Sequence, residues 1–504
     1  MGSMRSFDLF VLVVYLGGIF GMGCWLSRRS RGTEAFMAAG RSLSGWVVGL
    51  SIFGTYMSSI GFLGNPGKSY SGNWNPWVFG LSLPIAAWIA AKYFIPVYRS
   101  GKEVSAYFHL EKRFGPWARN YALICYLLTQ LARMGTILYL VALALAPLTG
   151  WDVRVIILLT GIMVTIYTLL GGIEAVIWTD VIQSVVLTVG ALLCGAMLLF
   201  RMPEGPGQLF EIARANEKFS LGSFALSFSE PTFWLILIYG VFINLQNFGI
   251  DQSFVQRYVT AKSDKDARFS VWLGALLFPP IAGILFFIGT GLFAFYSAQP
   301  ELLPVSVNAA EKPDAVFPYF IVTQLPVGLT GLLIASILAA AMSSVDTSLN
   351  SSATLFLRDI YLRYVRPEAG EAQSMRVLKV TTLLWGMAGT GAAVAMIKVK
   401  SALDAWWNLS GIFSGGMLGI FLLGLICRRA GNPAALLSTT VGLLMIVWLS
   451  LAKPGSWPEG WASWHSPFHP FMTIILGTST IVLLGALLGM LLSPSKADRA
   501  ADAP

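Results

Sequence analysis

Residues 45–70 read GWVVGLSIFGTYMSSIGFLGNPGKSY, an apolar run with glycines and a polar string at its middle. At about 1.5 Å per residue, such a run is long enough to cross a hydrocarbon core of about 30 Å. Backbone that leaves the helix at this depth is tolerated only where it lines a cavity or is buried in protein. The string TYMSS at residues 55–59 therefore predicts a broken membrane helix beside a cavity.

A second interruption lies at residues 246–249, which read QNFG inside the apolar run that begins near Phe233. The two interrupted runs are five helices apart, and a repeat of five helices returns in the opposite orientation because five is odd. Paired broken helices in such inverted halves indicate the binding site of a secondary transporter. The alternative is that the glycines only allow close helix packing.

The whole chain has the composition of a membrane protein, because 56% of its 504 residues are hydrophobic and only 12% are charged. A soluble domain carries about 25% charged residues. About thirteen apolar runs are long enough to span a bilayer, and they begin near Phe7, Trp46, Trp74, Trp117, Val153, Glu174, Phe233, Phe269, Leu329, Val377, Leu403, Pro433 and Phe471. The expected fold is an all-α polytopic membrane protein with a five-plus-five inverted-repeat core.

The repeats predict four parts of the chain. These are an extra helix and cytoplasmic loop at 1–43, a first repeat with an outer loop at 44–232, a second repeat at 233–430, and two further helices with a short tail at 431–504.

The net charge of +9 does not indicate a nucleic-acid partner, because the basic residues occupy alternate loops, as membrane topology requires. They fall on one side, the cytoplasmic one, if the amino terminus is outside; the clusters are Arg28/Arg29/Arg31/Arg41, Arg99/Lys102/Lys112/Arg113/Arg119, Arg257/Lys262/Lys265/Arg268, Arg358/Arg363/Arg366/Arg376 and Arg428/Arg429. The carboxyl terminus, with Lys496 and Arg499, then also lies in the cytoplasm. We expect a monomer surrounded by lipid in a bacterial inner membrane.

Several other classes of protein lack support in the sequence. The four cysteines lie in or at the ends of apolar runs, where they behave as small hydrophobes and predict no disulfide framework. The histidines, His109, His465 and His469, fall in loops, so a metalloprotease or haem site inside the membrane has no histidine ligand. A complete phosphate-binding loop is missing, which argues against an ATP motor. No nucleophile and base pair inside the bilayer indicates an enzyme, and no cofactor besides a coupling ion is expected.

The run that begins near Leu329 ends in AAMSSVDTSLN, residues 340–350. Two faces at i, i+3, i+4 spacing carry oxygen atoms, one with Ala340, Ser343 and Ser344 and the other with Ser343, Asp346 and Thr347. A small hard cation is bound by several oxygen atoms, and the unwound backbone at 54–57 offers further carbonyls. The alternative is a polar helix held by hydrogen bonds between helices.

Ionisable residues inside other runs also indicate function, because burying them in a bilayer costs several kcal/mol. Arg133 lies in the middle of the fourth run, where structural pairing and binding of an anionic substrate account for it equally well. Asp180 lies near the start of the sixth run, where helix capping is the better account of a lone residue. Asp251 follows the second interruption and is expected to be solvated or paired.

Together these stretches resemble the sodium/solute symporter family, which has the LeuT-type fold, and within it the bacterial sialic-acid symporters. The likeness is carried by GRS at 40–42, MSSIGFL at 57–63, Arg133-Met134 with Leu138-Tyr139-Leu140, GGIEAVIWTDVIQ at 171–183, DQSFVQRY at 251–258, SSVDTSLN at 343–350 and GLICRR at 424–429.

The resemblance implies two sodium sites and a substrate pocket. The common sodium site consists of the carbonyls of Gly54, Met57 and Ala340 with the hydroxyls of Ser343 and Ser344. A second sodium lies between Asp180 and Ser343, Asp346 and Thr347. Arg133 matches the position that holds the substrate carboxylate, and Tyr56, Ser58, Gly61, Trp77 and Phe248 complete the pocket.

The chain departs from those symporters at three of these positions. They carry a serine where this chain has Asp346, and small hydroxyl residues where it has Tyr56 and Gly61. The implied function is sodium-coupled import of a small organic solute by alternating access, with a carboxylated sugar such as sialic acid or another organic anion as the solute. One or two sodium ions, proton coupling, a neutral sugar as solute, and a transporter-like sensor stay open as alternatives.

Overall fold

The structure is a computed structural model that describes residues 5–27, 32–101, 103–307, 309–399, 402–452 and 464–492. Six basic residues of the topology argument lie outside these ranges: Arg28, Arg29, Arg31, Lys102, Lys496 and Arg499. Apart from one isolated bridge between Leu43 and Ala261, the described residues form helices and their connections.

Eleven helices of the described chain are long and apolar enough to cross a membrane, and one bent pair of helices adds a twelfth span. The pair is α3 (Gly45–Tyr56) and α4 (Ser59–Ser71), which meet at 55°. The helix α10 (Val153–Phe200) contains 48 residues, about 72 Å of helix, which is more than twice the hydrocarbon thickness. Gly172 interrupts it at φ 60°, ψ −162°, a conformation that favours glycine. Counting the two halves of α10 as two spans brings these twelve to the predicted number of about thirteen.

The other spans match the predicted runs within a few residues. They are α1 (Ser6–Ser27), α9 (Pro116–Thr149), α12 (Phe233–Ile250), α14 (Asp264–Ala298), α16 (Leu329–Leu355) with its continuation η7 (Phe356–Val365), α17 (Glu371–Met396), α18 (Ala402–Ile426), α19 (Asn432–Leu451) and α20 (Met472–Leu491). One span, from Asn75 to Arg99, consists of η2 (Asn75–Trp77), α5 (Val78–Leu81), α6 (Leu83–Ile89), η3 (Ala90–Phe94) and α7 (Ile95–Arg99).

Short helices join the spans. They are α2 (Thr33–Ala38), η1 (Ala39–Arg41), α8 (Phe108–Phe114), α11 (Pro206–Ala215), α13 (Gln252–Thr260), η4 (Pro300–Leu302), η5 (Val305–Val307), η6 (Pro313–Ala315) and α15 (Val316–Gln324).

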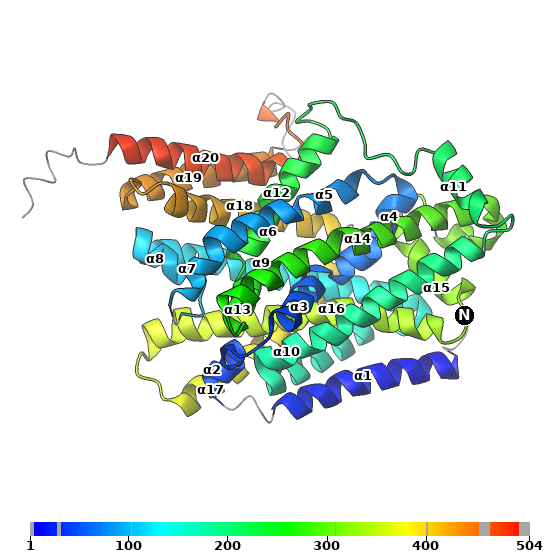
Figure 1. The fold of residues 1–504 in the computed structure, drawn as a ribbon, viewed down its shortest axis with the longest axis horizontal. Coiled ribbons are helices and arrows are strands. Elements are labelled where there is room, and N and C mark those ends of the chain that lie inside the picture. The colour runs from blue at the N-terminus through cyan, green and yellow to red at the C-terminus, as the bar shows by residue number, and fades with distance from the viewer. Residues whose placement is uncertain are drawn as a thin grey trace, which may run out of the picture.

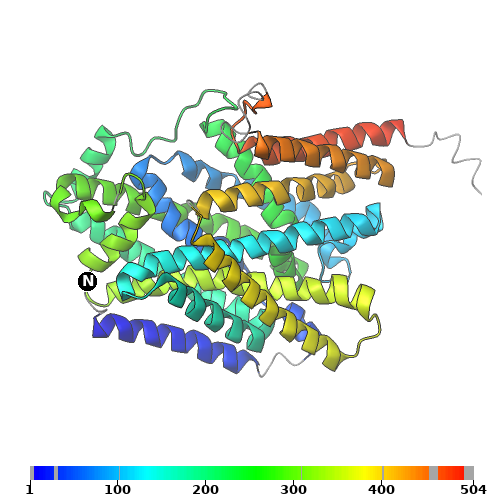
Figure 2. The same ribbon diagram turned by 180° about the vertical axis from the view of Figure 1, so that it is seen from behind.

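Most of the helices run along the long axis of the molecule (Figure 1). Helix α1 begins at one end of the molecule and α20 finishes at the other (Figure 1), as an odd number of crossings requires. Helices α18 to α20 pack together along one side, and α1 packs against α10 and α16 on the opposite side (Figure 2). Helices α2, α8 and α13 lie toward one end of the molecule, and α11 and α15 lie toward the other (Figure 1).

Helix α16 lies at the centre and is buried along almost its whole length, from Leu333 to Leu355. Its sequence is rich in Ala, Ser and Thr, and small residues allow the backbones of neighbouring membrane helices to approach closely. The hydroxyls bond within the helix or to other helices; Thr347 Oγ1, for example, donates to the carbonyl of Ser343 at 2.7 Å. Most hydroxyls of this polar central helix therefore keep a hydrogen-bond partner while buried; that of Ser352 has none among the described residues.

Both predicted helix breaks are present, but the second lies later than expected. The chain leaves α3 at Met57 and enters α4 after Ser58. The second break is at Asp251, between α12 and α13, whereas residues 246–249 remain helical. The side chain of Asp251 accepts a hydrogen bond from the amide of Ser253 and thereby caps α13, which fixes the break at this residue. Asp251 is thus a buried cap and not a solvated residue.

Candidate functional site

The broken end of α3 meets the middle of α16. Carbonyls in the last turn of a helix have no partner within that helix. Here the carbonyl of Gly54 accepts a hydrogen bond from Ser343 Oγ at 2.8 Å. The hydroxyl of Ser344 lies 3.3 Å from the carbonyl of Ala340 and 3.4 Å from that of Thr55. Side chains of α16 therefore satisfy the carbonyls that the break in α3 exposes.

This cluster of neutral oxygens has the chemistry of a sodium site. Four of the five predicted ligands meet there, namely Gly54, Ala340, Ser343 and Ser344. The fifth, Met57, is the buried residue at which the chain leaves α3. A sodium ion binds lone pairs, so the two hydroxyl protons would turn away from the carbonyls that they now contact. The chemistry of these donors, carbonyl and hydroxyl oxygens, fits such an ion.

Asp180 lies deep inside α10, so the interpretation as a helix cap is wrong. Its Oδ2 atom accepts a hydrogen bond from Ser51 Oγ at 2.5 Å and pairs with Arg257 Nη2 at 2.8 Å. Both side chains of this ion pair are 0% exposed. The same guanidinium donates to Thr347 Oγ1 at 2.6 Å, so Arg257 connects two of the predicted ligands of the second sodium.

Asp346 bonds to a different partner. Its Oδ2 atom accepts a hydrogen bond from the hydroxyl of Tyr167 at 2.5 Å, across the interface of α16 with α10. The Oδ1 atoms of Asp346 and Asp180 are both buried, and neither has a hydrogen-bond partner among the described residues. An unpaired buried carboxylate oxygen is costly, so these two atoms are candidate ligands for a cation.

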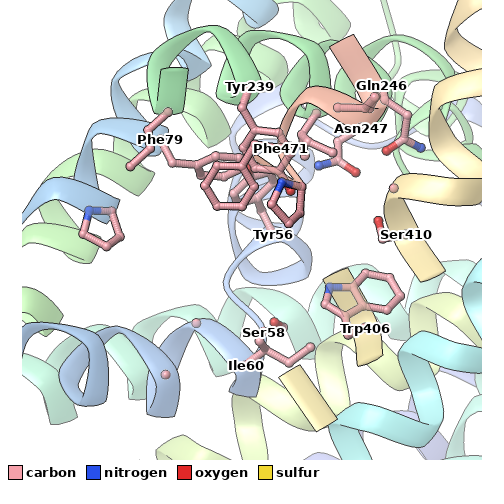
Figure 3. Close-up of a pocket in the computed structure, with 18 of the residues that line it drawn as sticks. Tyr56, Ser58, Ile60, Phe79, Tyr239, Gln246, Asn247, Trp406, Ser410 and Phe471 are labelled. Carbon is pink, nitrogen blue, oxygen red and sulfur yellow. The ribbon is translucent and has the colours of Figure 1, made fainter. Parts of the chain in front are cut away.

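A cavity of about 720 Å³ lies beside the broken turn of α3, within the usual size range of small-molecule sites. Four of the predicted pocket residues line it, namely Tyr56, Ser58, Gly61 and Arg133. Figure 3 shows aromatic rings of Tyr56, Tyr239 and Phe471 gathered on one side, with Ser58 and Trp406 across the space from them.

Two predicted pocket residues do not line this cavity. Trp77 donates from Nε1 to the carbonyl of Pro279 at 3.0 Å and so packs against α14. Phe248 is fully buried behind Tyr56, with ring centroids 5.8 Å apart. Both residues support the wall of the cavity from behind, because their side chains are engaged by neighbouring helices.

Tyr56 is the bulky residue at a position where small hydroxyl residues were expected. Its hydroxyl donates to Asn244 Oδ1, and Asn244 Nδ2 donates in turn to Ser82 Oγ at 2.8 Å. The ring also packs edge-on against Phe278 at 4.6 Å. The Tyr56 ring is thereby held against α12 and α14.

The cavity contains charges of both signs. Arg133 donates from Nη2 to the carbonyl of Thr55 at 2.9 Å, within the broken turn, and Asp251 also lines the space. Lys68 lies farther along α4, about 15 Å of helix from Ser58. Burial lowers the pKa of His469 below its ordinary value of 6.5, so this side chain adds no positive charge at neutral pH.

Sequence reasoning gave several of these residues no place in the site. Arg257 was counted among the basic residues of cytoplasmic loops, whereas the structure buries it in an ion pair with Asp180, 77 residues away. The polar residues Asn65 and Lys68, by contrast, follow Gly61 at helical spacing along the cavity face of α4. That spacing was a usable signal.

Comparison with known proteins agrees with this geometry. The profile of the Sodium:solute symporter family matches residues 36–442. The chain is 34% identical over 490 residues to the sodium/sialic acid symporter SiaT of Proteus mirabilis (strain HI4320), covering 96% of this chain and 95% of that protein.

Two solved structures are also similar. One shows a Na+-coupled sialic acid symporter in a substrate-bound outward-open state; its TM-score is 0.88 at 32% identity, covering 97% of this chain and 99% of that one. The other is Mhp1, a nucleobase-cation-symport-1 family transporter in a closed conformation, with a TM-score of 0.56 at 17% identity over 92% and 97% of the two chains. The second likeness concerns the fold alone, and it agrees with a LeuT-type architecture.

Proposed function

Since this chain belongs to the sodium:solute symporter family, and is therefore a multi-pass membrane protein that couples sodium to the transport of a small solute, we propose that its solute is an organic anion bound by Arg133. A carboxylated sugar such as sialic acid is the first candidate, because the relatives at this level of identity are named for that solute. The transport cycle is one of alternating access.

The observation that carries the proposal is the position of Arg133. Its guanidinium lines the cavity and holds the carbonyl of Thr55 at 2.9 Å, and the same carbonyl lies 3.4 Å from Ser344 Oγ. A guanidinium has five donors in a planar fork, so the bond to Thr55 leaves donors for a bidentate pair with a carboxylate. The anion and the first sodium site thus share one broken turn.

This shared turn explains how the two cargoes depend on each other. A sodium ion bound by the carbonyls of Gly54 and Met57 would fix the turn and, through Thr55, orient Arg133 toward the cavity. The positive ion would also attract the carboxylate. Each sodium that crosses the membrane with the potential gains about 2.3 kcal/mol per 100 mV, which drives accumulation of the solute.

A second candidate is a solute with no net charge. Asp251 lines the same cavity as Arg133, and a buried carboxylate near the guanidinium offsets part of its attraction for an anion. A neutral sugar or a zwitterion would use both groups. The binding experiment below separates these classes of solute.

The proposed topology has the amino terminus outside and the carboxyl terminus in the cytoplasm of a bacterial inner membrane. It is supported by the basic residues Arg99, Arg113 and Lys262, which belong to the α7, α8 and α13 end of the molecule (Figure 1). The inverted repeats are proposed to be 44–232 and 233–430, with 1–43 and 431–504 outside them. We propose a monomer in lipid, because one chain supplies every candidate ligand.

The test is a thermal-shift screen of the purified protein with sugar acids, neutral sugars of similar size and short monocarboxylates, each with and without sodium. We expect sugar acids to stabilise the protein only with sodium, and Arg133→Gln to abolish this shift while keeping the shift from sodium alone. Arg113→Gln is the control, because Arg113 also donates to backbone carbonyls, of Cys427 and Arg428, but lies outside the cavity. Undiminished acid binding by Arg133→Gln refutes the assignment.

A further inference from the structure

Helix α13 is short, polar and completely enclosed. All nine of its residues, from Gln252 to Thr260, are buried. It follows the break at Asp251 and lies toward the end of the molecule opposite α11 and α15 (Figure 1). A polar helix that is fully buried must have its side chains bonded to other elements.

Arg257 is the central side chain of this helix and the largest of the fully buried ones. It makes four hydrogen bonds: Nε to Ser51 Oγ at 2.7 Å, Nη1 to the carbonyl of Ser253 at 2.8 Å, Nη2 to Asp180 Oδ2 at 2.8 Å, and Nη2 to Thr347 Oγ1 at 2.6 Å. These bonds tie α13 to α3, α10 and α16. The positive charge of α13 is therefore placed directly on the proposed second sodium site.

The charges of this site do not balance. Asp180 and Asp346 carry two negative charges when ionised, and the guanidinium of Arg257, which is bonded to Asp180, carries one positive charge. The sum is −1. Within the described chain, each carboxylate also keeps one buried oxygen, Oδ1, without a hydrogen-bond partner. A buried charge that lacks a partner is strongly destabilising, so with both carboxylates ionised the site has a place for one monovalent cation.

We propose that Arg257 is a positioning residue that sets the charge of the second site and hence its affinity for sodium. This inference rests on the proposed function. The guanidinium occupies the Oδ2 side of Asp180, and one sodium ion occupies the Oδ1 side together with Asp346. Arg257 and the sodium ion thus bind the same carboxylate, that of Asp180, at different oxygen atoms.

The same arrangement couples the site to the motion of α13. If α13 separates from α10 and α16 to open the inner side of the cavity, Arg257 leaves with it, because the guanidinium is part of that helix. In the absence of sodium, this separation would leave the carboxylates of Asp180 and Asp346 without any cation. The uncompensated charges make the separation unfavourable. A bound sodium offsets one of the two charges, so α13 separates more readily from a loaded transporter than from an empty one.

The experiment compares charge variants by the sodium concentration that gives half of the thermal stabilisation. It uses purified protein in a Ser344→Ala background, which removes a ligand of the first site only. Arg257→Gln changes the charge of the site from −1 to −2 and should lower the sodium midpoint by about tenfold or more. At an effective dielectric of about 20, removing a unit positive charge within about 12 Å of a cation strengthens its binding constant by about that factor. Asp346→Asn changes the site to zero and should raise the midpoint by a similar factor.

The double variant Arg257→Gln/Asp346→Asn restores the sum of −1 and should return the midpoint to within about threefold of the background. Arg257→Lys keeps the charge and should do the same. Arg119→Gln is the matched control, because Arg119 forms another buried ion pair, with Asp359 at 2.5 Å, in η7 beyond the end of α16. It should lower stability and leave the sodium midpoint unchanged.

Three outcomes overturn the inference. One is an Arg257→Gln protein that binds sodium as weakly as Asp346→Asn, because a structural role alone would give that result. Another is a double variant no closer to the background than either single variant. The third is failure of both Arg257→Gln and the double variant to fold while Arg257→Lys folds and its midpoint shifts more than tenfold. Absence of any sodium-induced shift in the unmodified protein would instead refute the proposed function.

Discussion

Replacing Ser343 with alanine removes the one side chain shared by both proposed sodium sites. Its hydroxyl lies 2.8 Å from the carbonyl of Gly54, and the residue is only 1% exposed, so this interaction is shielded from bulk solvent. A buried interaction between a hydroxyl and a charge contributes about 1.5–3 kcal/mol. At about 1.4 kcal/mol for each factor of ten, loss of this ligand from one site should raise the sodium midpoint about tenfold to 150-fold.

The assay is uptake of the best solute from the thermal-shift screen into proteoliposomes, measured against external sodium at constant membrane potential. Ser336→Ala is a matched control on the same helix, because Ser336 Oγ also bonds to a carbonyl of another helix, that of Val186, at 3.0 Å. Both variants lose one buried hydroxyl, so both should lower the melting temperature. Only Ser343→Ala should change the sodium midpoint; a change of less than threefold, or an equal change in Ser336→Ala, refutes the site.

Two further predictions concern packing and pH. A Cβ atom at Gly54 would lie 2.6 Å from Ser184 Oγ and 3.3 Å from the carbonyl of Asp180. Gly54→Ala should therefore lower the unfolding free energy by about 1–3 kcal/mol, and adding Ser184→Ala should recover part of this loss. An unchanged loss in the double variant would show that the Ser184 hydroxyl is not the obstacle. Hydrogen bonding to Arg363 lowers the pKa of Glu111 to about 2. The ion pair of Glu111 therefore stabilises the fold above the ordinary pKa of about 4.5 and loses this effect as the pH falls toward 2. The difference in melting temperature between the unmodified protein and Glu111→Gln should shrink from pH 5 to pH 3, and a constant difference would contradict the assignment.

The sequence was sufficient for the fold and for selecting residues of the proposed first sodium site that the structure brings together, because both follow from local rules. Membrane helices must satisfy their own backbone groups, so a polar string in the middle of an apolar run marks a break. The spacing of Ser343 and Ser344 from Ala340 places them on one face of α16, and that face is the one that meets the broken end of α3. Helical periodicity alone was enough to select these residues.

The second site could not be worked out from the sequence in the same way. Asp180 looked like a helix cap because a separate run was expected to begin near Glu174. In the structure, α10 continues through the kink at Gly172, so Asp180 lies inside a helix. Its partner Arg257 comes from another part of the chain, and the pairing depends on how α13 packs against α10. Trp77 was misplaced for a related reason, since its indole faces Pro279 of α14 and not the cavity. Such contacts are set by tertiary packing, which no local spacing reports.

The hydrogen bonds of α13 also bear on the proposed separation of this helix from α10 and α16. The hydroxyl of Tyr126 lies 2.8 Å from Ser253 Oγ and 2.7 Å from Ser351 Oγ. Gln256 Nε2 donates to Asn350 Oδ1 at 2.8 Å. When such an interface opens, water replaces each bond at a net cost of about 0.5–1.5 kcal/mol. An apolar interface would instead lose about 25 cal/mol for every Å² exposed to water. Separation of α13 would therefore exchange these polar contacts for hydrogen bonds to water, which suits the proposed movement of this helix.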